Sequence, residues 1–166
     1  MSRPFHCPTR IHSGSSFETA VAGLLADRKW LLVTSEGWST RGAIEVLTAA
    51  AGQPVATIVS VPANPRISDI EKFSAGMPSV DVAVALGGGS VIDATKGIVA
   101  LTALGKDITP LLAHLKNGLE LSNTFAPIPV IAIPTTSGTG SEVTRWGTIW
   151  GDENEKFSLH NYKSVF

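Results

Sequence analysis

Four short apolar runs constrain the fold of this chain more than any other feature of its sequence. They are rich in Val, Ile, Leu and Ala, and they occupy residues 29–35, 55–61, 80–88 and 129–136. A nearly continuous apolar run is typical of a strand in a parallel sheet, because helices cover both faces of such a sheet. The sequence therefore predicts four strands of one buried sheet.

Helical patterns fill the segments before and between these runs. They cover residues 16–25, 39–51, 68–77, 90–104 and 108–116. The first four begin at or near a serine, which is a favoured N-cap residue. Strands that alternate with helices of this length predict an α/β fold with a doubly wound, mostly parallel sheet.

The two ends of the chain fit this alternation less well. Residues 5–13 include Pro8, and a proline cannot donate to a central ladder, so we expect at most an edge strand there. Residues 143–160 alternate bulky and polar side chains around Gly151-Asp152, which predicts a β-hairpin. The sequence stops soon after this hairpin without a closing helix. We expect a further domain to follow it.

Charge and hydropathy argue against several classes of partner. The 166 residues include 13 basic and 14 acidic side chains, which leaves a net charge of −1. Nucleic-acid binding depends on clustered basic residues, so we expect no nucleic-acid partner. No apolar run approaches the ~20 residues of a membrane span, and the N-terminus has no signal-peptide core. We expect a cytoplasmic protein with no membrane association, and we leave a homodimer open.

A run of three glycines and a serine, Gly87–Ser90, follows the third apolar run. Ligands of open α/β sheets bind beyond the carboxyl ends of the strands. Glycines let a ligand approach the main chain closely, and the start of the next helix offers free N–H groups to a phosphate. The alternative is a tight turn in which Ser90 and Asp93 form a capping box. We favour an anion-binding loop.

Two further loops follow strands at the same edge of the predicted sheet. Residues 134–142 are dense in Ser, Thr and Gly, and their hydroxyls suit phosphate or ribose oxygens. The alternative there is a polar turn with local hydrogen bonds. Ser35 follows the first strand, where dinucleotide sites often place an acid against the ribose. A hydroxyl removes the repulsion that an acid would exert on a 2′-phosphate, and the alternative is a plain helix-capping loop.

Metal and nucleophile motifs are missing from the sequence. The four histidines have no ligand spacing, and no serine or cysteine has a nucleophile motif. We therefore expect no metal ligand and no catalytic residue in this chain. His114 is interpreted as a structural histidine, and Trp146 and Trp150 as packing residues on one face of the hairpin.

With these loops placed, the order of motifs resembles the N-terminal half of the iron-containing alcohol dehydrogenase family. The resemblance rests on Asn64-Pro65, on residues 87–97 and on residues 133–144, and it runs from Pro8 to at least Lys156. The opening residues are most similar to reductases of small aldehydes, phosphonoacetaldehyde reductase among them. The resemblance implies that residues 1–166 form a Rossmann-like NAD(P)-binding domain, and that a helical metal-binding domain is missing from this chain.

The resemblance also assigns residues to the cofactor, NAD or NADP. The matching positions are Gly88, Gly89, Ser90, Asp93, Thr135, Thr136, Thr139 and Lys156. Ser35 stands where many members carry a ribose-binding Asp, so the choice between NAD and NADP is left open. The family's metal ligands come from beyond this chain, which implies that Fe²⁺ or Zn²⁺ is held only by the full-length enzyme.

The implied reaction is hydride transfer between nicotinamide and a small primary alcohol or aldehyde, with this domain supplying only cofactor binding. We expect the domain alone to be inactive. Two alternatives are kept open. One is a glycerol-dehydrogenase-like or dehydroquinate-synthase-like enzyme domain, and the other is a non-catalytic nucleotide-binding module.

Overall fold

The computed structural model describes residues 7–14, 16–122 and 124–160. Four parallel strands form the predicted sheet. The strands are β1 (Trp30–Thr34), β2 (Ala56–Ile58), β3 (Val82–Gly87) and β4 (Val130–Pro134). They are ordered β2-β1-β3-β4, and each neighbouring pair is parallel. The sheet predicted from the apolar runs is confirmed. The strands are shorter than the runs, most of all β2 at one edge.

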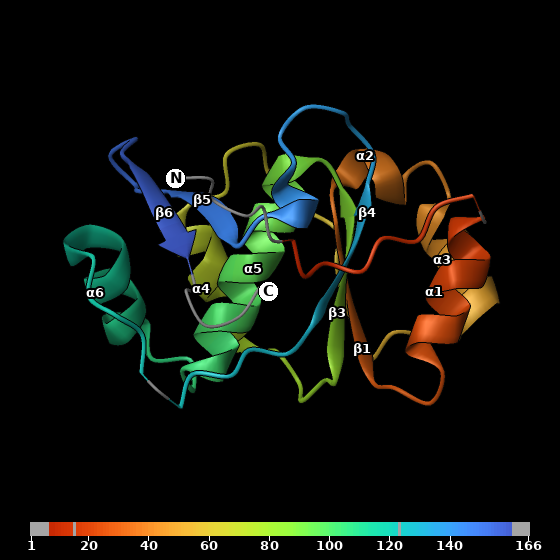
Figure 1. The fold of residues 1–166 in the computed structure, drawn as a ribbon, viewed down its shortest axis with the longest axis horizontal. Helices are drawn as coiled ribbons and strands as arrows, with labels where there is room; N and C mark the ends of the chain where they lie inside the picture. The colour runs from red at the N-terminus through yellow and green to blue at the C-terminus, as the bar shows by residue number, and fades with distance from the viewer. Residues whose placement is uncertain (1–6, 15, 123, 161–166) are drawn as a thin grey trace, which may run out of the picture.

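Helices cover both faces of this sheet (Figure 1). Helices α1 (Phe17–Leu25) and α3 (Ala43–Ala51) lie on one face, and α4 (Ile67–Ala75) and α5 (Gly89–Ala103) lie on the other. Alternate residues of β1 face opposite sides of the sheet. Leu32 packs in the core with α1 and α3, and Leu31 packs in the core with α4 and α5. Both sides of the central strands are therefore buried, and the doubly wound fold is confirmed.

Two helices follow one another between β3 and β4, as the pattern predicts. The first is α5, and the second, α6 (Ile108–Asn117), packs against α5 and the hairpin. Among the helices of the described segments, none is long and apolar enough to cross a bilayer.

The prediction of one helix over residues 39–51 is wrong at its start. A short helix α2 (Glu36–Ser39) comes first, and α3 begins only after Gly42. Gly42 has a φ of 79°, a left-handed conformation that separates the two helices and that glycine adopts without strain. The serine N-cap of the first helix is confirmed, because the Ser16 hydroxyl accepts a hydrogen bond from the Thr19 N–H.

The predicted hairpin is confirmed as β5 (Trp146–Trp150) and β6 (Lys156–His160), which pair antiparallel after a short 3₁₀ turn, η1 (Ser141–Val143). Its connection is longer than a two-residue turn, because residues 151–155 lie between the strands. The expected edge strand is wrong for residues 7–13, which form no strand. Pro8 has no N–H to donate to a ladder. Residues 5 and 6 lie outside the described residues.

Candidate functional site

The glycine loop, Gly87–Ser90, follows β3 at the point where the strand order reverses, which is between β1 and β3. In open α/β sheets, this switch point forms the crevice in which ligands bind. Strand β3 ends at Gly87, Gly88 is the N-cap, and α5 begins at Gly89. The Thr34 hydroxyl donates to the Leu86 carbonyl at 2.7 Å and joins the two strand ends. The sheet therefore places the N-terminus of a fifteen-residue helix at this crevice.

Residues 135–140, the loop after β4, pack directly on the glycine loop. We call this segment the threonine loop. A Cβ atom added at Gly88 would lie 3.0 Å from Thr136 Oγ1, and one added at Gly89 would lie 2.7 Å from Thr139 Cγ2. Side chains cannot occupy these positions without moving a threonine. The fold thus brings together two loops that are more than forty residues apart in sequence.

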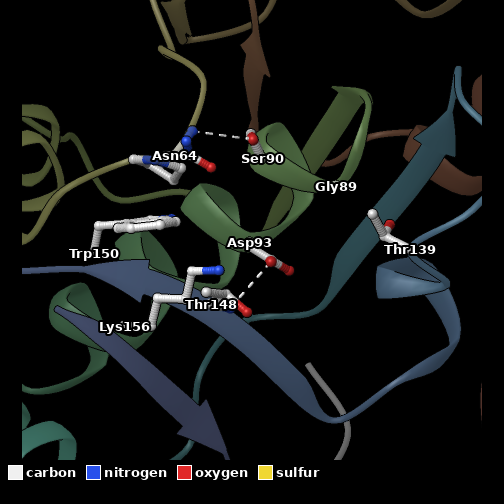
Figure 2. Close-up of a pocket in the computed structure, with 9 residues that line it drawn as sticks. Asn64, Gly89, Ser90, Asp93, Thr139, Thr148, Trp150 and Lys156 are labelled. Atoms are coloured by element: carbon white, nitrogen blue, oxygen red, sulfur yellow. Dashed lines mark hydrogen bonds between the residues drawn. The ribbon is translucent and has the colours of Figure 1, made fainter. Parts of the chain in front are cut away.

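The capping-box alternative for Ser90 and Asp93 is wrong. The Ser90 hydroxyl accepts from the Asn64 N–H at 3.3 Å, and Asp93 Oδ2 accepts from the Thr148 N–H at 3.0 Å (Figure 2). Both side chains bind other segments instead of their own helix. Position along α5 explains this, because Gly88 rather than Ser90 is the N-cap.

These side chains surround one pocket (Figure 2). It is lined by Asn64, Pro65, Gly89, Ser90, Asp93, Thr139, Thr148, Trp150 and Lys156. Five of these nine are residues that the resemblance assigned to the cofactor. The pocket joins the N-terminus of α5, the segment before α4, the threonine loop and the hairpin.

Asp93 is the most unusual residue of the pocket. Only 8% of its surface is exposed, and its Oδ1 atom is buried with no hydrogen-bond partner among the described residues. Burial raises the pKa of this carboxyl group, against the bond from Thr148, the charge of Lys96 and the nearby Ser141 hydroxyl. A buried acceptor without a donor costs free energy, which makes Asp93 an unusual residue for the wall of a pocket.

Lys156 supplies positive charge to the same pocket. Its ammonium lies 4.6 Å from the centroid of the Trp150 ring, and Figure 2 shows it directed into the pocket from β6. Stacking of a cation on an aromatic ring orients the side chain at low cost. An anionic group bound at the start of α5 would therefore meet both backbone N–H groups and an ammonium.

Lys96 holds the wall of the pocket together. Its buried ammonium donates to the carbonyls of Ser141, Thr144 and Trp146 at 2.7, 2.7 and 2.6 Å. Burial lowers the pKa of Lys96 to about 8, although the charge of Asp93 opposes the shift. The ammonium fixes η1 and the start of β5 against α5. The sequence reasoning missed this role, and the only available signal was a lysine one helical turn after Asp93.

The other four predicted residues are not among those that line the pocket: Gly88, Thr136, Ser35 and Thr135. Thr136 covers Gly88, and Ser35 is the N-cap of α2. The Thr135 hydroxyl accepts from Trp38 Nε1 at 3.1 Å, which links the loop after β1 to the loop after β4. The nine predicted residues therefore divide into two groups along one crevice.

The sequence reasoning also missed four residues of the pocket. Trp150 was interpreted as a packing residue, yet it lines the pocket beside Thr148, which lies on the same face of β5. Asn64 and Pro65 follow the second apolar run, and Asn64 has a φ of 55°. This left-handed backbone conformation is uncommon for a residue other than glycine, and such conformations cluster at binding sites. It cannot be recognised from the sequence alone.

The interpretation of His114 as a structural residue agrees with its surroundings. It is buried, its Nδ1 lies 2.7 Å from the Leu119 carbonyl, and its Nε2 accepts from the His160 N–H at 3.3 Å. Within the described ranges, no group of three or more His, Cys, Asp or Glu residues could hold a metal ion.

Comparison with known proteins agrees with this geometry. The model of the family described as iron-containing alcohol dehydrogenase matches residues 8–165. A 4-hydroxybutyrate dehydrogenase of Cupriavidus necator is 36% identical over 138 residues, which are 81% of this chain and 36% of the relative. A phosphonoacetaldehyde reductase of Streptomyces viridochromogenes is 42% identical over 71 residues, which are 42% of this chain and 18% of the relative.

The fold also matches solved structures. A sulfoacetaldehyde reductase of Bifidobacterium kashiwanohense, solved in complex with NAD⁺, superposes with a TM-score of 0.82 at 21% identity. The match covers 98% of this chain and 44% of that protein, so the chain spans less than half of the relatives it matches. Taken with the family match over nearly the whole sequence, this shows that the chain belongs to the iron-containing alcohol dehydrogenase family.

Proposed function

We propose that this chain is the NAD(P)-binding domain of a metal-dependent alcohol dehydrogenase or aldehyde reductase. Its substrates are small primary alcohols or aldehydes. When bound, the nicotinamide dinucleotide supplies or accepts the hydride in this interconversion. The observation that carries the proposal is the pocket at the N-terminus of α5, which the glycine loop, Asp93 and Lys156 line together.

The residues present fit a dinucleotide in two halves. Its pyrophosphate suits the start of α5, where Gly88 and Gly89 keep side chains away from the backbone and Lys156 supplies positive charge. Its nicotinamide suits the pocket, where the carboxamide N–H would donate to the carboxylate of Asp93. Asp93 would thereby orient the ring, and Trp150 would exclude water beside it.

The remaining predicted residues support the other half of the crevice. Thr136 and Thr139 lie against the two glycines, and their hydroxyls suit phosphate oxygens. Thr135 and Ser35 lie toward the loop after β1, where the adenosine ribose would rest. A divalent metal does not fit the described residues, which contain no cluster of metal ligands.

Titration with NADH and NADPH tests the proposal on this chain. Binding is followed by calorimetry and nicotinamide fluorescence, with folding checked by circular dichroism. We expect saturable binding to at least one of the two, which Asp93→Ala and Lys156→Met each weaken about tenfold by removing a charge-assisted bond. Lys116→Met, on the exposed end of α6, is the matched control and should bind like the parent.

The outcomes separate clearly. Absence of binding at millimolar concentration of either dinucleotide, by a folded sample, would overturn the proposal. Equal affinities in Asp93→Ala and the parent would show that the nicotinamide does not use this pocket.

A further inference from the structure

The loop after β1 faces the same crevice as the glycine loop. Strands β1 and β3 are neighbours, and the bond from Trp38 to Thr135 ties the loop after β1 to the loop after β4, which packs on the glycine loop. If the pyrophosphate rests on the glycine loop and the nicotinamide in the pocket, the adenosine half extends toward the loop after β1. This step rests on the proposed function.

Arg41 places a guanidinium over that loop. Its Nη1 lies 3.4 Å from the position that a Cβ of Gly37 would occupy, and its Cζ lies 5.2 Å from the centroid of the Trp38 ring. The side chain therefore folds back over the first turn after β1, supported by a tryptophan that is itself hydrogen-bonded. Among the described residues, no carboxylate forms an ion pair with this guanidinium.

Ser35 completes the arrangement. It is the first residue after β1, where an acid would bind a ribose 2′-hydroxyl and repel a 2′-phosphate. A serine hydroxyl can donate to a phosphate oxygen instead. The acid of this loop, Glu36, comes one residue later and is exposed to solvent.

We propose that Arg41 and Ser35 form a binding site for the 2′-phosphate of NADP(H), so that this domain prefers the phosphorylated dinucleotide over NAD(H). A guanidinium binds a phosphate by two parallel charge-assisted bonds, which a bare ribose cannot offer. Stacking on Trp38 holds the guanidinium in place before the ligand arrives.

Paired titrations of this chain with NADPH and NADH, at equal ionic strength, test the inference. We expect the parent to bind NADPH at least about tenfold more tightly than NADH. Arg41→Met keeps the aliphatic contact with Trp38 and should abolish this preference while changing NADH affinity less than about twofold. Ser35→Asp should reverse the preference.

Arg28→Met is the matched control. It removes the same charge from an exposed position just before β1, at the amino ends of the strands and away from the crevice. We expect it to leave both affinities unchanged. Glu36→Gln should leave NADH binding intact.

Several results would overturn the inference. They are a parent that prefers NADH, an Arg41→Met variant that loses both dinucleotides equally, and a Glu36→Gln variant that loses NADH selectively, which would identify Glu36 as the ribose ligand. If neither dinucleotide binds the parent, the proposed function itself fails, and that result is distinct from binding without a preference.

Discussion

The two sides of the glycine loop are built in different ways. On the hairpin side, the buried Lys96 binds three carbonyls, and the Arg66 guanidinium donates to the Asp152 carbonyl and Asn154 Oδ1 at 2.6 and 2.8 Å. On the side of the loop after β1, one bond from a partly buried Trp38 reaches Thr135. Charged and buried contacts fix one wall of the crevice, and a neutral contact holds the other.

Under the proposed function, this difference separates two tasks in binding a dinucleotide. A nicotinamide must be held in one orientation for hydride transfer, and preorganised polar contacts provide that. The adenosine half takes no part in the chemistry, so the loop proposed to bind it can vary and select between dinucleotides. We expect the hairpin side to respond to substitutions mainly through stability, and the other side mainly through ligand preference.

The largest expected effect is that of Lys96→Met. The substitution removes the ammonium that three carbonyls share, although the Trp146 carbonyl still accepts from the Thr144 hydroxyl, and we expect the free energy of unfolding to fall by about 3 kcal/mol. Urea denaturation followed by circular dichroism measures it. Lys72→Met, on the exposed face of α4, is the control and should stay within about 0.5 kcal/mol of the parent. A loss below about 1 kcal/mol for Lys96→Met would show that the hairpin side is not held by this residue.

Gly89→Val should come next, acting on the boundary between the two sides. Its Cβ would lie 2.7 Å from Thr139 Cγ2 and would push the threonine loop outward. We expect dinucleotide affinity to fall about a hundredfold or more, with a recognisable fold, since close approach to the main chain is blocked. The control is Gly23→Val, because nothing lies within 4 Å of a Cβ at Gly23. A Gly89→Val variant that binds the dinucleotide as tightly as the parent would show that the glycine loop is only a turn.

Thr135→Val should have a smaller effect, on the loop after β1. It removes the acceptor of the Trp38 bond without changing the side chain's shape, and we expect a loss of about 1 kcal/mol in unfolding free energy. Thr57→Val, at an exposed position of β2, is the control. If Thr135→Val destabilised the chain as much as Lys96→Met, the contrast between the two sides would be wrong.

The smallest expected effect is a pH dependence confined to the hairpin side. His114 Nε2 accepts a hydrogen bond, so the folded protein holds this residue neutral, and burial lowers its pKa below the usual value of 6.5. On acidification, the unfolded chain gains this proton first. The contribution of His114 to stability is therefore complete above the unfolded pKa and is lost as the pH falls through the folded pKa.

Urea denaturation at pH 7.5 and 5.5 checks this dependence. His114→Gln should lose part of the difference between the two pH values, while Thr135→Val should retain all of it. A parent and His114→Gln with the same pH dependence would contradict the assignment.

Much of this architecture could be predicted because its signals are local. The apolar runs around β1 and β3 indicate buried parallel strands, and Gly87–Ser90 indicates close packing at a strand end. Errors arose where one residue's backbone decided the outcome. Gly42 separates two helices that share one apolar pattern. The left-handed conformation of Gly42 cannot be predicted from that pattern.

The sequence by itself determined the sheet, its order of helices and strands, and the loops at its carboxyl edge, because hydrophobic periodicity and glycine content are properties of neighbouring residues. Only the tertiary structure decided which side chains share the pocket. Trp150 and Asn64 line it beside Ser90 because chain segments far apart in sequence meet there. The role of Lys96 and the role proposed for Arg41 depend in the same way on carbonyls and rings that fold around them, and no spacing along the chain records such contacts.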